Sequence, residues 1–111
     1  MNPKDTKISV LGDGGWGTTL TLLLAEKKYP VCLWGAFPAY VDEIRKKREN
    51  LKFLPGFKIP ENVTLVADIR KAVLESEIIV LAIPSQHMRS VLKKIRKETL
   101  KGKFFVSVAK G

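Results

Sequence analysis

Short apolar runs alternate along this chain with longer segments in which apolar residues recur every three or four positions. A short continuous run is typical of a strand buried on both faces of a sheet, and the longer spacing is typical of a helix with one buried face. The runs predict strands over residues 7–11, 31–34, 63–66, 77–83 and 104–109. The spacing predicts helices over residues 15–28, 37–48, 69–74 and 86–95.

A glycine-rich turn, with Gly12, Gly14 and Gly17, directly follows the first predicted strand. The spacing is that of a dinucleotide-binding turn: the first glycine permits the bend, the second lets backbone approach a pyrophosphate, and the third lets helix and strand pack closely. The N-terminus of the next helix would offer unpaired N–H groups to phosphates. Glycine-rich turns also occur for structural reasons alone, but the flanking strand and helix favour cofactor binding.

Strand and helix alternate throughout the chain, which implies parallel strands with right-handed crossovers and helices on both faces of the sheet. Together with the glycine turn, this predicts an α/β fold, a Rossmann-type doubly wound parallel sheet with strand order 3-2-1-4-5. We expect the short strand 63–66 near an edge. A length of 111 residues fits one domain, over residues 1–111.

Two features lie outside this alternation. Residues 51–60 contain two prolines and a glycine among apolar residues, so we expect an ordered loop packed by its own side chains. Asp68 and Ser85 each precede a predicted helix and are placed to cap it.

Composition narrows the classes of function. A net charge of +9 raises the question of nucleic acid, but the basic runs fall on the polar faces of predicted helices without stacking aromatics between them, which favours solvated faces. Cys32 is the only cysteine, and we expect it to be a buried, reduced thiol. It has no partner residues for a disulfide or a metal cluster, so we expect no metal site. No apolar run reaches the length of a membrane span and no signal peptide is evident, so we expect a cytoplasmic protein.

Ligands of open α/β sheets bind outside the carboxyl ends of the strands, which places the candidate site residues on one rim. The rim would hold the glycine turn, residues 35–37, residues 84–87 and Lys110. The Lys110 ammonium could hold a substrate phosphate or polarise a carbonyl, or it could be a surface lysine. His87 has no evident catalytic partner and reads as a surface or cofactor-edge histidine.

Several motifs together are more specific than the glycines alone. They are Gly12-x-Gly14-x-Trp16-Gly17, Leu33-Trp34, Glu49-Asn50-Leu51-Lys52-Phe53-Leu54-Pro55-Gly56, Ile59-Pro60-Glu61-Asn62-Val63, Pro84-Ser85-Gln86 and Lys110-Gly111. With these motifs the chain resembles, over essentially all 111 residues, the N-terminal domain of NAD(P)-dependent glycerol-3-phosphate dehydrogenase.

This resemblance implies hydride transfer between NAD or NADP and dihydroxyacetone phosphate or glycerol 3-phosphate, feeding phospholipid synthesis. It implies that Lys110 contacts both cofactor and substrate. It also implies cofactor contacts by Gly15, Trp16, Phe53 and the residues at the end of the second strand, Ala36 and Phe37. The glycine spacing and the strand-end rule add Gly12, Gly14, Gly17, Pro84 and Ser85 to the cofactor-binding positions. Arginines are common in the family where this chain has Ala36 and Phe37, and Arg45 and Lys46 lie far along the next helix, so the choice between NAD and NADP stays open.

The family's proton-donating lysine lies in a helical C-terminal domain that follows the segment matched here, so no catalytic residue is expected in this chain. We expect the chain alone to bind dinucleotide weakly and not to turn over substrate, because half a cleft cannot hold both reactants. The whole protein could form a homodimer. Two alternatives stay open: a stand-alone dinucleotide-binding regulatory module, and the same domain of another two-domain dehydrogenase.

Overall fold

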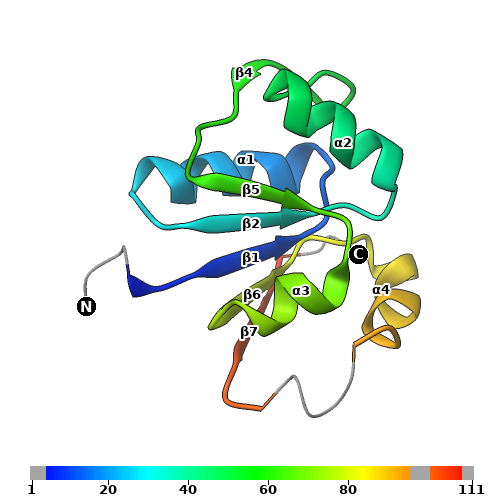
Figure 1. Ribbon diagram of the computed structural model, residues 1–111. Coiled ribbons are helices and arrows are strands. Elements are labelled where there is room, and N and C mark those ends of the chain that lie inside the picture. The colour runs from blue at the N-terminus through cyan, green and yellow to red at the C-terminus, as the bar shows by residue number, and fades with distance from the viewer. Residues whose placement is uncertain (1–4, 96–100, 109–111) are drawn as a thin grey trace.

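The computed structural model describes residues 5–95 and 101–108, and its centre is a parallel sheet with strand order β5-β2-β1-β6-β7 (Figure 1). The strands are β1 (Ile8–Leu11), β2 (Val31–Trp34), β5 (Val63–Val66), β6 (Ile78–Leu81) and β7 (Phe104–Ser107). The helices are α1 (Gly15–Glu26), α2 (Pro38–Lys47), α3 (Ile69–Leu74) and α4 (Ser85–Leu92).

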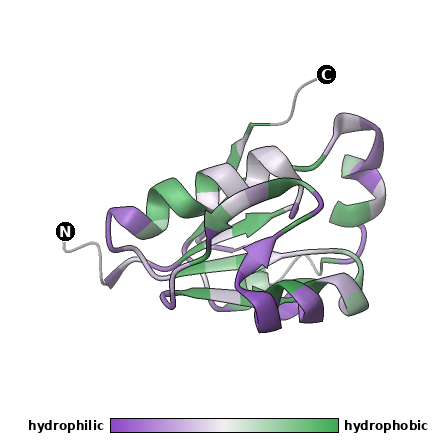
Figure 2. Ribbon diagram, turned by 90° about the horizontal axis from the view of Figure 1, so that it is seen from above, coloured by the Kyte–Doolittle hydropathy of each residue, from purple (hydrophilic) through white to green (hydrophobic). Residues whose placement is uncertain are grey.

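Helices cover both faces of the sheet, as predicted, with α1 and α2 on one face and α3 and α4 on the other (Figure 1). The strands separate their side chains accordingly, because successive residues of a strand point to opposite faces. Val10 and Leu33 belong to the apolar cluster under α1 and α2, whereas Leu11 and Trp34 belong to the cluster that packs against α3 and α4. In Figure 2 the strands in the interior are mostly hydrophobic, and the most hydrophilic stretches lie on the outer helices and turns.

With all strands numbered in chain order, the strand order of the sheet is 5-2-1-6-7 and not the predicted 3-2-1-4-5. The numbers differ because the chain forms two further short strands, which the prediction did not include. These are β3 (Glu49–Asn50) and β4 (Leu54–Lys58), which pair antiparallel as a separate ribbon. The prediction of a loop over residues 51–60 was wrong for this ribbon. Gly56 adopts a φ of 90°, and the register shifts between Glu49 and Asn50, so an irregular ribbon accommodates the proline and the glycine.

The predicted elements extend beyond the observed ones at several ends. Helix α1 ends at Glu26 because Lys28 has a φ of 75°, which no helix continues through. Asp68 caps α3 as predicted, since its side chain accepts a hydrogen bond from the backbone N–H of Arg70 at 3.0 Å. Ser85 does not cap α4: the N-cap is Pro84, and Ser85 is the first helical residue.

The last strand also differs from expectation. A strand buried on both faces was expected at 104–109, but all four residues of β7 are exposed. Because β7 pairs only with β6 among the described strands, it forms one edge of the sheet, and β5 forms the other edge, as predicted.

The register of the sheet brings the strand ends to one side of the molecule. Leu11 at the end of β1 pairs with Trp34 of β2 and with Leu81 of β6, and the ends of the edge strands lie beside them. The segments after β1, β2 and β6 therefore leave the sheet next to one another, and their side chains can share one site.

Candidate functional site

A cavity of about 740 Å³ lies at the carboxyl ends of the strands, within the range of small-molecule and cofactor sites. It opens between the turn after β1, the end of β2 and the segment that joins β6 to α4. Its lining consists of Gly12, Asp13, Gly14, Gly15, Trp16, Gly17, Trp34, Ala36, Phe37, Phe53, Ala82, Ile83, Pro84, His87, Ser90, Val91 and Lys94.

Two glycines of the turn are required by close packing. Gly12 has a φ of +125°, and a Cβ built on it would lie 2.4 Å from the carbonyl oxygen of Ala82. A Cβ on Gly17 would lie 1.9 Å from the carbonyl oxygen of Gly12. Both distances are far below van der Waals contact, so these two glycines let the turn, α1 and the end of β6 approach one another.

Gly14, between them, is free of such packing. A Cβ on Gly14 would meet no atom within 4 Å, although the residue lines the cavity. Gly14 is also the N-cap of α1 and offers no side chain to the N–H groups of the first turn. Those N–H groups have no partner within the helix and carry its positive dipole end. The turn thus leaves open, beside backbone donors, the space that an anionic group such as a pyrophosphate requires.

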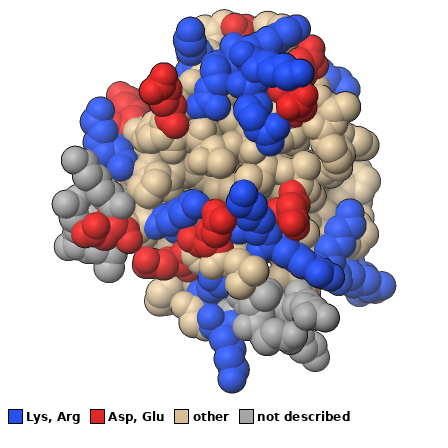
Figure 3. All heavy atoms as spheres, in the orientation of Figure 1, with Lys and Arg blue, Asp and Glu red and all other residues tan. Residues whose placement is uncertain are grey.

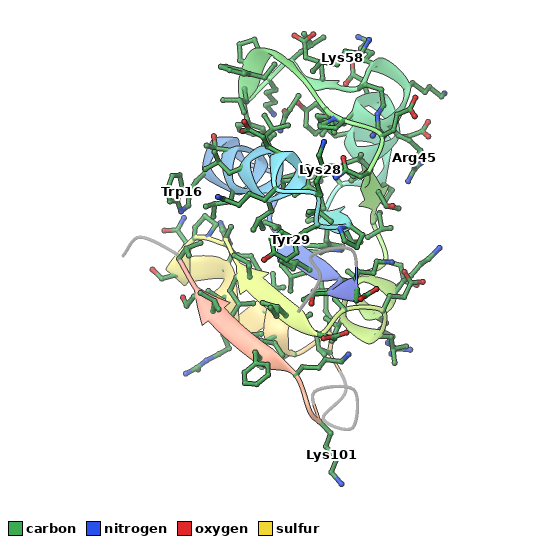
Figure 4. The ribbon with its side chains drawn as sticks, turned by 90° about the vertical axis from the view of Figure 1, so that its left-hand side faces the viewer. Trp16, Lys28, Tyr29, Arg45, Lys58 and Lys101 are labelled. Atoms are coloured by element: carbon green, nitrogen blue, oxygen red, sulfur yellow. The ribbon has the colours of Figure 1, made fainter. Side chains whose placement is uncertain are left out.

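Aromatic side chains line the cavity. Trp16, Phe37 and Phe53 are 53%, 72% and 45% exposed, although large apolar side chains are ordinarily buried. Figure 4 shows Trp16 at the end of the molecule toward which the arrows of β6 and β7 point. Exposed aromatic faces around a cavity are suited to stacking on flat rings, so these side chains favour a ligand that contains such rings.

The side chain of Asn50, which is completely buried, attaches the ribbon that precedes Phe53 to the glycine turn. Its Nδ2 donates to the carbonyl oxygen of Asp13 at 2.7 Å and to Oγ1 of Thr18 at 2.8 Å. Its Oδ1 accepts from the hydroxyl of Tyr40 and from the backbone N–H of Phe53. The turn and Phe53 are therefore held in fixed relation by one amide.

Asp13, within the glycine turn, carries an unpartnered buried carboxylate oxygen. Its Oδ2 lies against Gly35, at the end of β2, where a Cβ would be 2.1 Å away. Burial raises the pKa of the Asp13 carboxyl above its ordinary value, against the opposing effects of its own backbone N–H and of the Lys52 cation. A buried acceptor without a donor is costly, so this oxygen can accept a hydrogen bond that none of the described residues supplies.

The segment between β6 and α4 forms the remaining wall. Pro84, His87 and Lys94 line the cavity there. The exposed imidazole of His87 lies beside the Gln86 side chain, with 3.5 Å between their Nε2 atoms. A histidine at the edge of the cavity agrees with its sequence interpretation. Ser85, the first residue of helix α4, is not part of the cavity lining.

The structure brings together most of the residues that the sequence placed at the site. The cavity lining includes nine of the predicted cofactor positions: Gly12, Gly14, Gly15, Trp16, Gly17, Ala36, Phe37, Phe53 and Pro84. Lys110 lies outside the described residues. The sequence interpretation missed Asp13 and Lys94; an acid between two glycines of such a turn was a readable signal, whereas Lys94 was hidden in a basic run.

Three features of the described residues bear on other chemistries. In residues 5–95 and 101–108, no group of three or more His, Cys, Asp or Glu side chains could hold a metal ion. Within the same ranges, no helix is long and apolar enough to cross a bilayer. Lys and Arg side chains gather over α2 with acidic side chains among them (Figure 3), and Asp42 pairs there with Arg45 and Lys46.

Comparisons with known proteins agree with this geometry. The family model described as the N-terminus of NAD-dependent glycerol-3-phosphate dehydrogenase matches residues 7–111. A glycerol-3-phosphate dehydrogenase [NAD(P)+] of Prosthecochloris aestuarii is 44% identical over 94% of this chain and 31% of its own length. The chain thus spans about a third of the length of the curated relatives it matches.

Solved structures show the same similarity. The glycerol-3-phosphate dehydrogenase of Coxiella burnetii superposes with a TM-score of 0.85 and 28% identity, over 96% of this chain and 33% of that one. The enzyme of Saccharomyces cerevisiae superposes with a TM-score of 0.77 and 30% identity, over 96% of this chain and 34% of that one.

Proposed function

Since the chain belongs to the family of the N-terminal domain of NAD-dependent glycerol-3-phosphate dehydrogenase, we propose that it binds NAD or NADP in the cavity at the carboxyl ends of β1, β2 and β6. The pyrophosphate would be held by the N-terminus of α1, beside Gly14. Trp16, Phe37 and Phe53 would contact the flat rings of the cofactor.

The observation that carries this proposal is the difference between the glycines of the turn. Gly12 and Gly17 are required by close packing, but Gly14 faces open space and is not. A turn that served only to connect β1 with α1 would have no use for a glycine at this position, where φ is −72° and any residue fits. A ligand that must approach the backbone of Gly14 explains the missing side chain.

We propose that the whole protein transfers a hydride between NAD(P)H and dihydroxyacetone phosphate to give glycerol 3-phosphate, as the names of its relatives indicate. When bound, the nicotinamide supplies or accepts the hydride. In this proposal the described residues bind and orient the cofactor, and none of them is assigned a catalytic role. Lys110 would contact cofactor and substrate, on the family resemblance alone. Ser85 would lie beside the cofactor, because it follows the carboxyl end of β6.

The resemblance also supports proposals about the protein's setting. The reaction would take place in the cytoplasm and supply glycerol 3-phosphate to phospholipid synthesis, and the whole protein could act as a homodimer. Residues 1–111 would form one dinucleotide-binding domain of that protein.

Isothermal titration calorimetry of the chain with NADH and with NADPH tests cofactor binding. We expect saturable binding of at least one of them, and weaker binding by Gly14→Ala, whose methyl group would stand in the open space. Absence of heat with both cofactors, from a chain shown to be folded by circular dichroism, would contradict the proposal. Oxidation of NADH with dihydroxyacetone phosphate by the chain alone, above a Lys110→Ala control, would contradict the expectation that the chain does not turn over substrate.

A further inference from the structure

The end of β2 lacks the side chain that ordinarily selects between the two nicotinamide cofactors. In this class of fold, an Asp or Glu after the second strand hydrogen-bonds the adenosine ribose of NAD, whereas a nearby arginine accommodates the 2′-phosphate of NADP. Here β2 is followed by Gly35, Ala36 and Phe37, none of which is charged. The usual determinant of cofactor preference is therefore missing at its usual position.

The Asp13 carboxylate occupies the neighbourhood of that position from another element. Its Oδ2 would lie 2.1 Å from a Cβ on Gly35, and the Val41 side chain would lie 2.8 Å from the same point. Because Gly35 has no side chain, the carboxylate fits against the backbone at the end of β2. An acid supplied by the glycine turn thus stands where this fold ordinarily places an acid of the second strand.

The surroundings of the carboxylate leave it a hydrogen bond to accept. Oδ2 is buried and has no donor among residues 5–95 and 101–108, and Asp13 lines the cavity. Arg45 of α2 is engaged elsewhere, with Asp42 and with the carbonyl oxygen of Leu65. Lys52 acts on the carboxylate electrostatically. The site therefore offers a carboxylate oxygen that can accept a hydrogen bond from a hydroxyl group. The negative charge of Asp13 offsets the positive charge of Lys52 nearby.

We propose that Asp13 is the residue that selects the cofactor, accepting a hydrogen bond from the adenosine ribose of NAD and repelling the 2′-phosphate of NADP. This inference rests on the proposed function and extends it, because it gives the chain a preference for NAD over NADP. A carboxylate accepts strongly from a hydroxyl, whereas a phosphate beside it would bring like charges together.

The test compares the dissociation constants of NADH and NADPH, measured by calorimetry, for the chain and for Asp13→Asn. Asparagine keeps the shape of the side chain but removes its charge, which would leave Lys52 unopposed toward a phosphate. We expect the unmodified chain to bind NADH more tightly, and the ratio of the two constants to shift by about tenfold toward NADPH in Asp13→Asn. Asp42→Asn removes the same charge from an exposed site on α2, and it should leave the ratio unchanged.

Gly35→Ala provides a second route to the same result without changing any charge. Its methyl group would displace the Asp13 carboxylate from the end of β2. The ratio of the dissociation constants of NADH and NADPH should therefore also shift toward NADPH. An Asp13→Asn chain that binds both cofactors with the original ratio overturns the inference and leaves the proposed function standing. An equal shift in Asp42→Asn does the same, since it would show a general effect of charge. Failure of the unmodified chain to bind either cofactor overturns both.

Discussion

The side-chain Nδ2 of Asn50 donates a hydrogen bond to the carbonyl oxygen of Asp13 across a separation of 37 residues, with 2.7 Å between the two atoms. The same amide contacts Thr18, Tyr40 and Phe53, so it links the glycine turn, α2 and the ribbon that carries Phe53. The position of the turn relative to Phe53 depends on a residue that itself does not line the cavity.

Asn50→Ala should therefore lower both stability and affinity. The change removes one side chain that serves several partners and leaves them buried without it, which should cost about 2–4 kcal/mol of unfolding free energy. The turn and Phe53 would lose their common anchor, so dinucleotide affinity should fall by more than about fivefold even where the variant is fully folded. Urea denaturation and calorimetry measure the two effects.

Asn62 offers a matched control for this prediction. Its side chain also bridges two carbonyl oxygens, those of Ala25 and Tyr29, and it does not line the cavity. Asn62→Ala should lower stability without changing affinity. If Asn62→Ala weakens cofactor binding as much as Asn50→Ala does, the effect on binding follows from lost stability and the positioning role is wrong.

Gly14→Ala and Gly17→Ala should separate binding from folding. A methyl group on Gly14 meets no atom, so this variant should be as stable as the unmodified chain, or up to about 1 kcal/mol more stable, and yet bind the cofactor at least about tenfold more weakly. A methyl group on Gly17 would overlap the carbonyl of Gly12 and should cost more than about 3 kcal/mol of stability. Thermal denaturation distinguishes them, and unchanged cofactor affinity in Gly14→Ala would contradict the role of that glycine.

Phe37→Ala should weaken binding by about fivefold, or about 1 kcal/mol, without loss of stability, because a side chain that is mostly exposed contributes little to the core. Phe57 of β4 is a suitable control, since it is also exposed, at 57%, but lies outside the cavity lining. Phe57→Ala should leave affinity unchanged in the same titration. Equal losses from both substitutions would show that Phe37 has no specific contact with the cofactor.

The pKa of Asp13 predicts how stability depends on pH. Burial raises the pKa of this carboxyl in the folded state above the ordinary 3.8. As the pH rises from 3.8 through the raised pKa, ionisation of Asp13 therefore lowers the free energy of unfolding. Asp13→Asn does not ionise, so it should be more stable than the unmodified chain at pH 7. The difference should disappear as the pH falls below 3.8, where the carboxyl is protonated in both states. Urea midpoints measured across this range would contradict the prediction if the difference stayed constant.

The sequence was sufficient to predict the sheet and most of the cavity wall. The short, almost continuous apolar runs at β1, β2 and β6 indicated strands that are buried on both faces of the sheet. The rule for strand ends then placed Gly14, Phe37 and Pro84 together. These features depend on local pattern and on a general property of parallel sheets, so they can be read without coordinates.

The features that the sequence did not reveal depend on contacts between distant segments. The partners of Asn50 lie up to 37 residues away, and nothing in the residues around it indicates a buried amide. The ribbon of β3 and β4 contains Pro55 and Gly56, which favour a loop in any local reading. The approach of Asp13 to Gly35 follows from the pairing of β1 with β2, and it could be recognised only when both strand ends were placed.

The two tryptophans give the chain two built-in fluorophores in opposite environments. Trp34 is 3% exposed, and its indole N–H donates to the carbonyl oxygen of Ala67 at 2.9 Å, whereas half of Trp16 is open to solvent beside the cavity. Indole emission moves to longer wavelength as water surrounds the ring, so the folded chain should emit a shorter-wavelength component from Trp34 and a longer one from Trp16. Both side chains line the cavity, but only Trp16 is widely exposed there, so a molecule that enters the cavity should alter mainly the second component, and unfolding removes the first. Occupancy and integrity of the fold can therefore be followed separately in one cuvette.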